Sequence, residues 1–295
     1  MSDAPVTVVT GANSGIGRAT AIHLAAQGYD VYGTVRDPGR ATKLAAMSDE
    51  RGVEVRLVGL DVGDDESVRR GFEEILGATG GRVDVLVNNA GVAGNGTVED
   101  TDPAAYLEAM NVNLCGAVRC CQAVLPGMRA RGAGAIVNVS SVAGRVAALA
   151  QSSYVTSKWA LEALSEALAQ ELAPFGIRVV IVEPGVTRSA IFAKSVDIPD
   201  RTGAYGDHYR RMFQMYAAGI AHATDPFEVA VVIHHAVTTD SPELRYRVSW
   251  GSDELIGGRE RMTDAEWLSL GAAPDDDAYY ARFQELFGLD IRPAG

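Results

Sequence analysis

Short runs of β-branched and apolar residues alternate along the chain with longer segments of helical periodicity. The runs that predict strands are residues 6–10, 30–35, 54–59, 83–88, 135–140 and 178–183, followed by a last strand near 244–250. Helices are predicted near 15–27, 64–76, 103–131 and 152–172, with a weaker one near 41–47 and another opening at Asp225 and Pro226. Several strand runs are almost continuously apolar, as in parallel strands buried on both faces. The pattern predicts an α/β fold with a doubly wound parallel sheet of Rossmann type and about seven strands.

Composition and charge narrow the class of protein. The 295 residues are 47% hydrophobic and 22% charged, and no linker or repeat divides them, so we expect a single domain over residues 1–295. A net charge of −12 argues against binding nucleic acid or an anionic membrane. With no signal segment and no spanning segment, the sequence predicts a cytoplasmic protein. The three cysteines and five histidines lack metal-ligand spacing, so no metal is expected.

A glycine-rich turn separates the first predicted strand from the first helix. It reads Thr10-Gly11-Ala12-Asn13-Ser14-Gly15-Ile16-Gly17. Glycines at such a turn let the backbone approach a pyrophosphate, and the helix N-terminus supplies positive potential. The turn therefore predicts dinucleotide binding, with Gly11, Asn13, Ser14, Gly15, Ile16 and Gly17 as candidate contacts.

Two further candidate cofactor segments follow the third and fourth strands. Asp61 and Val62 follow the third strand, where Asp61 could accept a hydrogen bond from an adenine amino group. Asn88-Asn89-Ala90-Gly91 follows the fourth and offers Asn88, Ala90 and Gly91. The structural alternatives are that Asp61 caps its own loop and that Asn88 bridges two strands.

Tyr154 and Lys158 stand one helical turn apart in the helix predicted over 152–172. Four helical steps turn about 400°, so the phenol and the ammonium group share a face. A lysine charge about 5 Å away would favour the phenolate by roughly 3 kcal/mol, which lowers the tyrosine pKa by about two units. Tyr154 would then suit general acid–base catalysis near neutral pH.

Taken together, these segments resemble the short-chain dehydrogenase/reductase family. The matching motifs are TGANSGIG (10–17), NNAG (88–91), the region of Asn113, Ser141, YVTSK (154–158) and PGVT (184–187). The resemblance is close from residue 6 to about 185, and VYGTVRD (31–37) is similar to the 17β-hydroxysteroid and retinol dehydrogenase subgroup. It implies hydride transfer between an alcohol or carbonyl substrate and a nicotinamide.

The resemblance also implies roles for individual residues. Ser141, 13 positions before Tyr154, would orient the substrate oxygen, with Ser140 turned away by strand alternation. Asn113 would hold a water that links Lys158 to solvent, with Asn111 as its rival. Lys158 and Tyr154 would also contact the nicotinamide ribose. Pro184 and Gly185 would wall the nicotinamide, and Thr187 would reach its carboxamide or a phosphate.

The end of the second strand bears on the choice between NADP and NAD. Val35 occupies the position where an NAD enzyme usually carries an acidic residue, and Arg36 follows it. An arginine can hold a 2′-phosphate. We therefore expect NADP as the cofactor. The alternative is NAD, with Arg36 paired to Asp37 and Asp37 holding the ribose.

The remaining segments predict a substrate lid and a helical tail. Residues 186–224 would form the lid, which contains nine large apolar or aromatic residues: Ile191, Phe192, Ile198, Tyr205, Tyr209, Met212, Phe213, Met215 and Tyr216. Five of them fall at helical spacing on one side, namely Tyr205, Tyr209, Met212, Phe213 and Tyr216. The tail, residues 252–295, contains a capping box at Thr263–Glu266 and an aromatic helix near 278–287, which should dock on the body or on another subunit. The family resemblance implies a homodimer or homotetramer.

The sequence thus predicts an NADP-dependent alcohol dehydrogenase or carbonyl reductase acting on a fairly large apolar small-molecule substrate. Two alternatives are an NAD-dependent enzyme of the same family and a non-catalytic dinucleotide sensor. A sensor would be expected to lack Ser141, Tyr154 or Lys158, and all three are present.

Overall fold

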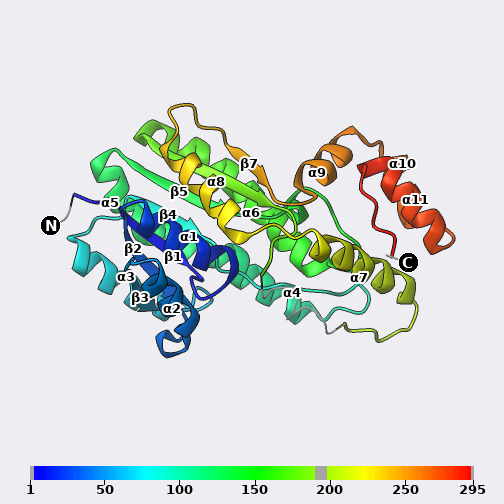
Figure 1. Ribbon diagram of the computed structural model, residues 1–295, viewed down its shortest axis with the longest axis horizontal. Helices are drawn as coiled ribbons and strands as arrows, with labels where there is room; N and C mark the ends of the chain where they lie inside the picture. Colours follow the sequence, from blue (N-terminus) through cyan, green and yellow to red (C-terminus); the bar gives the residue numbers. More distant parts are fainter. Residues whose placement is uncertain (1–2, 190–197, 294–295) are drawn as a thin grey trace.

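The computed structural model describes residues 3–189 and 198–293. Within them, seven parallel strands form one sheet in the order β3-β2-β1-β4-β5-β6-β7 (Figure 1). The strands are β1 (Val6–Thr10), β2 (Asp30–Val35), β3 (Val55–Gly59), β4 (Val85–Asn88), β5 (Gly134–Val139), β6 (Ile177–Pro184) and β7 (Arg245–Val248). The predicted strands and the doubly wound order are confirmed, with bounds that differ by at most two residues.

Helices cover both faces of the sheet. On one face lie α1 (Gly15–Ala26), α2 (Thr42–Glu50) and α8 (Pro226–Thr238), and on the other α3 (Asp65–Thr79), α5 (Gly116–Arg131) and α6 (Ser152–Leu172). Successive strand residues point to opposite faces. Val8 therefore packs in the core under α3 and α5, while its neighbour Val9 packs in the core under α1 and α8. Short 3-10 turns complete the body: η1 (Pro38–Arg40), η3 (Val142–Gly144) and η4 (Ala173–Phe175).

The helix predicted over residues 103–131 is interrupted. The structure has α4 (Pro103–Met110), then a π-helical stretch η2 (Asn111–Cys115), and only then α5. A π-helical turn inserts an extra residue into an α-helix and often marks a functional site. Here it contains Asn113, which is 2% exposed. Sequence periodicity did not predict this break because the stretch contains neither proline nor an internal glycine.

Beyond the sheet, α7 (Gly206–Ala221) and the tail helices α9 (Ser252–Arg261), α10 (Asp264–Gly271) and α11 (Asp276–Phe287) gather at one end of the molecule (Figure 1). The capping box at Thr263 and Glu266 is present, and the aromatic residues of α11 pack in a core with α9 and α10. Val146 after η3 and Met215 of α7 belong to the same core, so the tail packs on the body of the chain, while docking on another subunit stays a prediction. Ile191 and Phe192 lie outside the described residues.

The sequence did not predict α9. Its two adjacent glycines, Gly257 and Gly258, disfavour a helix by about 1 kcal/mol each relative to alanine. The structure supplies the reason for one of them. A Cβ on Gly258 would lie 2.6 Å from Cδ1 of Phe287, so the glycine lets α11 pack directly on α9. Within the described ranges, no helix is long and apolar enough to cross a bilayer.

Candidate active site

A cleft of about 1270 Å³ opens at the carboxyl ends of the strands. It begins at Arg36 beyond β2, passes Tyr154 and Lys158, and ends among the tail helices at Phe287. In open α/β sheets, ligands bind at this edge. Among the described residues, no group of three or more His, Cys, Asp or Glu side chains could hold a metal ion.

The glycine-rich turn lines one end of the cleft through Gly11, Asn13, Ser14, Gly15 and Ile16. Helix α1 begins there without a side-chain cap and without an acidic residue in its first turn. By contrast, aspartate side chains cap α3, α4 and α8. The first N–H groups of α1 are thus left to face the cleft, as a phosphate requires. A Cβ at Gly15, where φ is +53°, would lie 2.9 Å from the Ser189 side chain, so only glycine fits.

Gly17 supports this turn but does not line the cleft. A Cβ at Gly17 would lie 2.5 Å from the carbonyl oxygen of Gly11 and 2.3 Å from Nδ2 of Asn89. Asn89, which sequence reasoning missed, donates to the Thr10 carbonyl at 2.9 Å and fixes the turn to the end of β4. The signal was present, because Asn89 is the second residue of the NNAG motif.

Most of the other predicted cofactor residues line the same cleft. They are Asp61, Val62, Ala90, Gly91, Pro184, Gly185 and Thr187. Asp61 also accepts a hydrogen bond from the Gly63 N–H at 2.9 Å, which bears out the alternative that it caps its own loop. Its contact with the adenine stays a prediction. The Thr187 hydroxyl lies 2.8 Å from that of Ser249, which holds it at the floor of the cleft.

Asn88 and Asn113 do not line the cleft. The structure bears out the alternative for Asn88, an amide that bridges two strands, and its contact with the cofactor stays a prediction. Asn88 ends β4 and is buried, so its amide group needs a hydrogen-bond partner within the fold. It donates to Oδ1 of Asn138 on the neighbouring strand β5 at 2.9 Å. The Asn113 side chain accepts from the Val92 N–H at 2.8 Å and donates to Ser157 Oγ at 2.9 Å. The amide of Asn113 thus braces α6 beneath the site, and its predicted hold on a water remains a prediction.

The part of the cleft between the glycine-rich turn and Tyr154 is called the nucleotide half. At its far end, beyond β2, Arg36 is exposed and lines the cleft. Asp37 does not pair with it. The Asp37 carboxylate accepts from the Gly39 N–H at 3.0 Å and pairs with Arg40 at 3.3 Å. Arg40, which sequence reasoning did not single out, also lines the cleft. Two guanidinium groups therefore stand where β2 ends.

The catalytic candidates come together midway along the cleft. Ser141 lies two residues after the end of β5 and caps the N-terminus of η3. Its hydroxyl accepts from the Ala143 N–H at 3.1 Å and hydrogen-bonds to the Tyr154 phenol. Ser140 is 4% exposed, and its side chain lies against Gly144. Of the two serines, Ser141 is therefore the one that faces Tyr154.

Lys158 lies one turn beyond Tyr154 and is 5% exposed. Its ammonium nitrogen donates to the Val139 carbonyl at 2.9 Å and lies 5.8 Å from the centre of the Tyr154 ring. Burial lowers the pKa of Lys158 to about 8, against a smaller effect of the Glu162 charge that raises it. The proton of Lys158 is therefore exchangeable near neutral pH.

The predicted lowering of the Tyr154 pKa is wrong for the protein alone. Burial raises the pKa of Tyr154, and the hydrogen bond from Ser141 lowers it by less. The prediction considered only the charge of Lys158. In the structure, burial of the phenol itself is the largest effect on its pKa, and the Lys158 ammonium group donates to the Val139 carbonyl.

The other half of the cleft is mainly apolar. It lies between the segment after η3, helix α7 and the tail, and is lined by Val142, Val146, Leu149, Met212, Met215, Tyr216, Leu255, Trp267, Leu270, Phe283 and Phe287. Helix α7 is tied to α11, because Arg211 donates to Asp276 at 3.0 Å while 2% exposed. Gln214 donates to the Ile291 carbonyl at 2.7 Å. The tail thus forms a wall of the site.

The cleft has a nucleotide half, an apolar half and a tyrosine, serine and lysine between them, which defines an oxidoreductase that uses a nicotinamide dinucleotide. A model of the short chain dehydrogenase family matches residues 5–198. Human 17-beta-hydroxysteroid dehydrogenase type 1 is 36% identical over 254 residues, which cover 82% of this chain and 76% of that protein.

Solved structures of short-chain dehydrogenases and related reductases share this fold. A short-chain dehydrogenase from Streptomyces avermitilis superposes with a TM-score of 0.78 at 35% identity, covering 94% of this chain and all of that one. A single-residue variant of the actinorhodin polyketide ketoreductase with NADPH superposes with a TM-score of 0.72 at 28% identity, covering 83% and 96%. The chain belongs to the short-chain dehydrogenase/reductase family and is an oxidoreductase acting on an alcohol or carbonyl with NAD(P).

Proposed function

We propose that the protein is an NADP-dependent oxidoreductase that interconverts a primary or secondary alcohol and a carbonyl on a fairly large apolar substrate. The observation that carries the proposal is the position of Tyr154, which hydrogen-bonds to Ser141 at the junction between the nucleotide half and the apolar half of the cleft. A substrate oxygen placed there would meet a proton donor, while its body lies against apolar side chains.

The chain's own residues supply positioning and proton transfer. Tyr154 takes the proton from an alcohol, or gives one to a carbonyl, and Ser141 orients the same oxygen. Lys158, whose pKa burial lowers to about 8, holds a proton next to that exchange. The backbone shape at Gly11 and Gly15 and the open N-terminus of α1 fit a pyrophosphate. When bound, the nicotinamide supplies the hydride donor or acceptor.

The two arginines at the end of β2 support NADP over NAD. A 2′-phosphate needs cationic donors, and Arg36 and Arg40 both line this end of the cleft. The Asp37 carboxylate, which an NAD enzyme would use for the ribose, is engaged by Gly39 and Arg40. The ketoreductase with NADPH is consistent with this choice.

The cofactor proposal is tested by fluorescence titration of NADPH and NADH. Arg36→Ala should weaken NADPH binding by about tenfold or more while changing NADH binding little, because only NADPH carries the phosphate. Arg70→Ala is a matched control, since Arg70 of α3 is exposed, pairs with Glu66 and does not line the cleft. Equal loss of both dinucleotides in Arg36→Ala, or tighter binding of NADH by the wild type, would count against NADP.

The apolar half supports a large substrate, and we propose that residues 186–224 act as its lid. Met212, Met215 and Tyr216 of α7 lie over the cleft, and Phe283 and Phe287 of α11 close its far side. A panel that follows NADPH absorbance with steroid, retinoid, polyketide-like and small aryl carbonyls tests this directly. Preference for a small carbonyl over every polycyclic or long-chain one would contradict the proposal.

We also propose a homo-oligomer formed through α4 and α6. Leu107 of α4 is 72% exposed and Trp159 of α6 is 49% exposed, and these two helices pack side by side. Light scattering should give a multiple of the 31.1 kDa chain, and Trp159→Glu should shift it toward the monomer. A wild-type monomer at micromolar concentration would contradict the proposal.

A further inference from the structure

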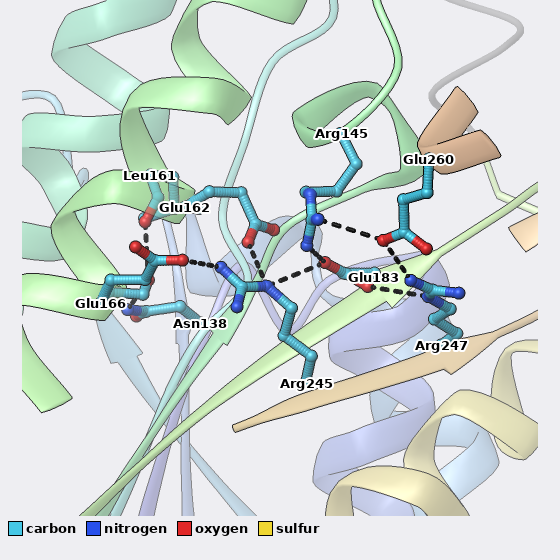
Figure 2. Close-up of polar contacts among 10 residues, drawn as sticks. Asn138, Arg145, Leu161, Glu162, Glu166, Glu183, Arg245, Arg247 and Glu260 are labelled. Carbon is cyan, nitrogen blue, oxygen red and sulfur yellow. Dashed lines mark hydrogen bonds and ion pairs between the residues drawn. The ribbon is translucent and has the colours of Figure 1, made fainter. Parts of the chain in front are cut away.

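Behind the catalytic turn lies a cluster of charged side chains that does not line the cleft (Figure 2). It joins five parts of the fold through Glu162 and Glu166 of α6, Glu183 of β6, Arg245 and Arg247 of β7, Arg145 after η3, and Glu260 of α9. Its position between the Ser141 turn and the Tyr154 helix places it next to the site without contact with substrate.

Two carboxylates at the centre of the cluster are buried and share one arginine. The side chain of Glu183 is 0% exposed and that of Glu162 is 6% exposed. Nε of Arg245 lies 3.1 Å from Glu162 and 3.2 Å from Glu183. Burial, and then the charge of Glu162, raise the pKa of Glu183. Glu183 also pairs with Arg145 and Arg247, whereas Arg245 is the cation that pairs with Glu162. Buried carboxylates depend on such counter-ions to stay charged.

Glu162 is the member that faces Lys158. It lies one turn after Lys158 on α6, so the two side chains share a face of the helix. Its Cγ packs against the place where a Cβ of Gly144 would be, at 3.0 Å, directly behind the turn that carries Ser141. One carboxylate oxygen is held by Arg245. Within the described residues, the other oxygen, Oε1, has no hydrogen-bond partner although it is buried.

The remaining charged groups around Lys158 do not substitute for Glu162. Those on α6 and on the elements around it are Tyr154, Glu166 and Glu171 of α6, Glu108 of α4, Arg178 and Glu183 of β6, Arg145 after η3 and Arg245 of β7. Glu183 and Arg245 act on Glu162, and Glu162 is the charge that offsets the effect of burial on Lys158.

We propose that Glu162 is a positioning residue for the reaction: its buried carboxylate, held by Arg245, keeps the Lys158 ammonium group protonated beside Tyr154. Glu162 acts through Lys158 and touches neither substrate nor cofactor. The catalytic part of this inference rests on the proposed function, whereas the coupling between Glu162 and Lys158 does not.

The test is Glu162→Gln compared with wild type and with Glu166→Gln. Glu166 is a matched control, because it also pairs with Arg245, at 2.5 Å, but is 55% exposed and lies one turn further from Lys158. The chain has only three lysines, so NMR of 13Cε-lysine can follow Lys158 directly. A second readout is the pH dependence of kcat/KM on the best carbonyl of the substrate panel.

In Glu162→Gln, Lys158 should titrate lower by about one to two pH units, as expected for loss of a charge one helical turn away at an effective dielectric near 20. The alkaline limb of kcat/KM should move the same way, and Glu166→Gln should leave both unchanged. An unchanged Lys158 midpoint, or equal shifts in both variants, would overturn the inference. Failure of the proposed function would appear separately, as turnover retained by Tyr154→Phe.

A second variant keeps the test decisive if Glu162→Gln does not fold. Arg245→Gln removes the cation that keeps the buried Glu162 carboxylate charged and in place. A buried carboxylate without a counter-ion takes up a proton, so Lys158 should titrate at lower pH than in wild type, as in Glu162→Gln. A midpoint that stays the same or rises would overturn the inference.

Discussion

Replacing Lys158 by methionine should make the protein more stable at pH 7 while removing its turnover. Lys158 is 5% exposed, and burial lowers its pKa from 10.5 to about 8. That difference corresponds to about 3 kcal/mol by which the buried charge destabilises the fold below pH 8. Methionine has a similar length and no charge. Losing the hydrogen bond to the Val139 carbonyl costs about 1 kcal/mol, so a net gain of about 2 kcal/mol is expected.

The effect has a defined pH window. Because the folded pKa of Lys158 lies below its unfolded value, the unfolded chain binds the proton between about pH 8 and 10.5 while the folded chain has lost it. Wild-type stability due to this group is therefore lowest below pH 8 and rises with pH across that window. The advantage of the methionine variant should shrink over the same range, reach zero somewhat below pH 10.5, and reverse by about 1 kcal/mol above it, where only the lost hydrogen bond remains.

Urea denaturation of wild type and Lys158→Met at pH 7, 8, 9 and 10 measures this difference, and the comparison cancels other titrating groups. Lys43→Met, at an exposed position on α2, is the matched control and should change stability little at every pH. The reasoning is refuted if Lys158→Met is less stable than wild type at pH 7, or if their difference stays constant from pH 7 to 10.

Three further predictions follow from the geometry of the site and tail. Tyr154→Phe should lower kcat by at least about 100-fold with NADPH binding kept, measured by steady-state kinetics and fluorescence, because only the proton-transferring oxygen is removed. Gly185→Ala should destabilise the fold by about 1–3 kcal/mol in urea, since its Cβ would lie 2.1 Å from the Trp250 carbonyl; an unchanged midpoint would contradict this. Asp276→Asn should speed proteolysis within α11, because it weakens the pairs with two arginines of α7, whereas exposed Asp277→Asn should not.

Sequence reasoning placed the residues of the cleft well where the motif and the strand end are adjacent in the chain. The TGANSGIG turn, Asp61, Ala90 and Ser141 each follow a strand directly. Parallel strands bring their carboxyl ends to one edge, so local motifs converge there without knowledge of side-chain packing.

Interactions were harder to predict where a partner lies far along the chain. The Asn88 amide, for example, donates to Asn138, 50 residues later, which the sequence offered only as an alternative. The pKa of Tyr154 was predicted from its neighbour alone, while burial by the surrounding fold raises it. The salt bridge between Arg211 and Asp276, which attaches the tail to α7, could not be inferred from either segment alone.

Because the tail helices line the apolar half of the cleft, different parts of the chain line the two halves. The residues proposed for nucleotide binding and proton transfer precede residue 190, within the part that the family model matches, whereas many of the apolar residues proposed to select the substrate belong to α7 and the tail helices. Because α7 and α11 are joined to each other by Arg211 and Asp276, we expect them to be exchangeable only together. Grafting α7 and the tail, residues 206–221 and 252–293, from a relative should then transfer the choice of substrate, while α8, β7 and the nucleotide preference stay with the recipient.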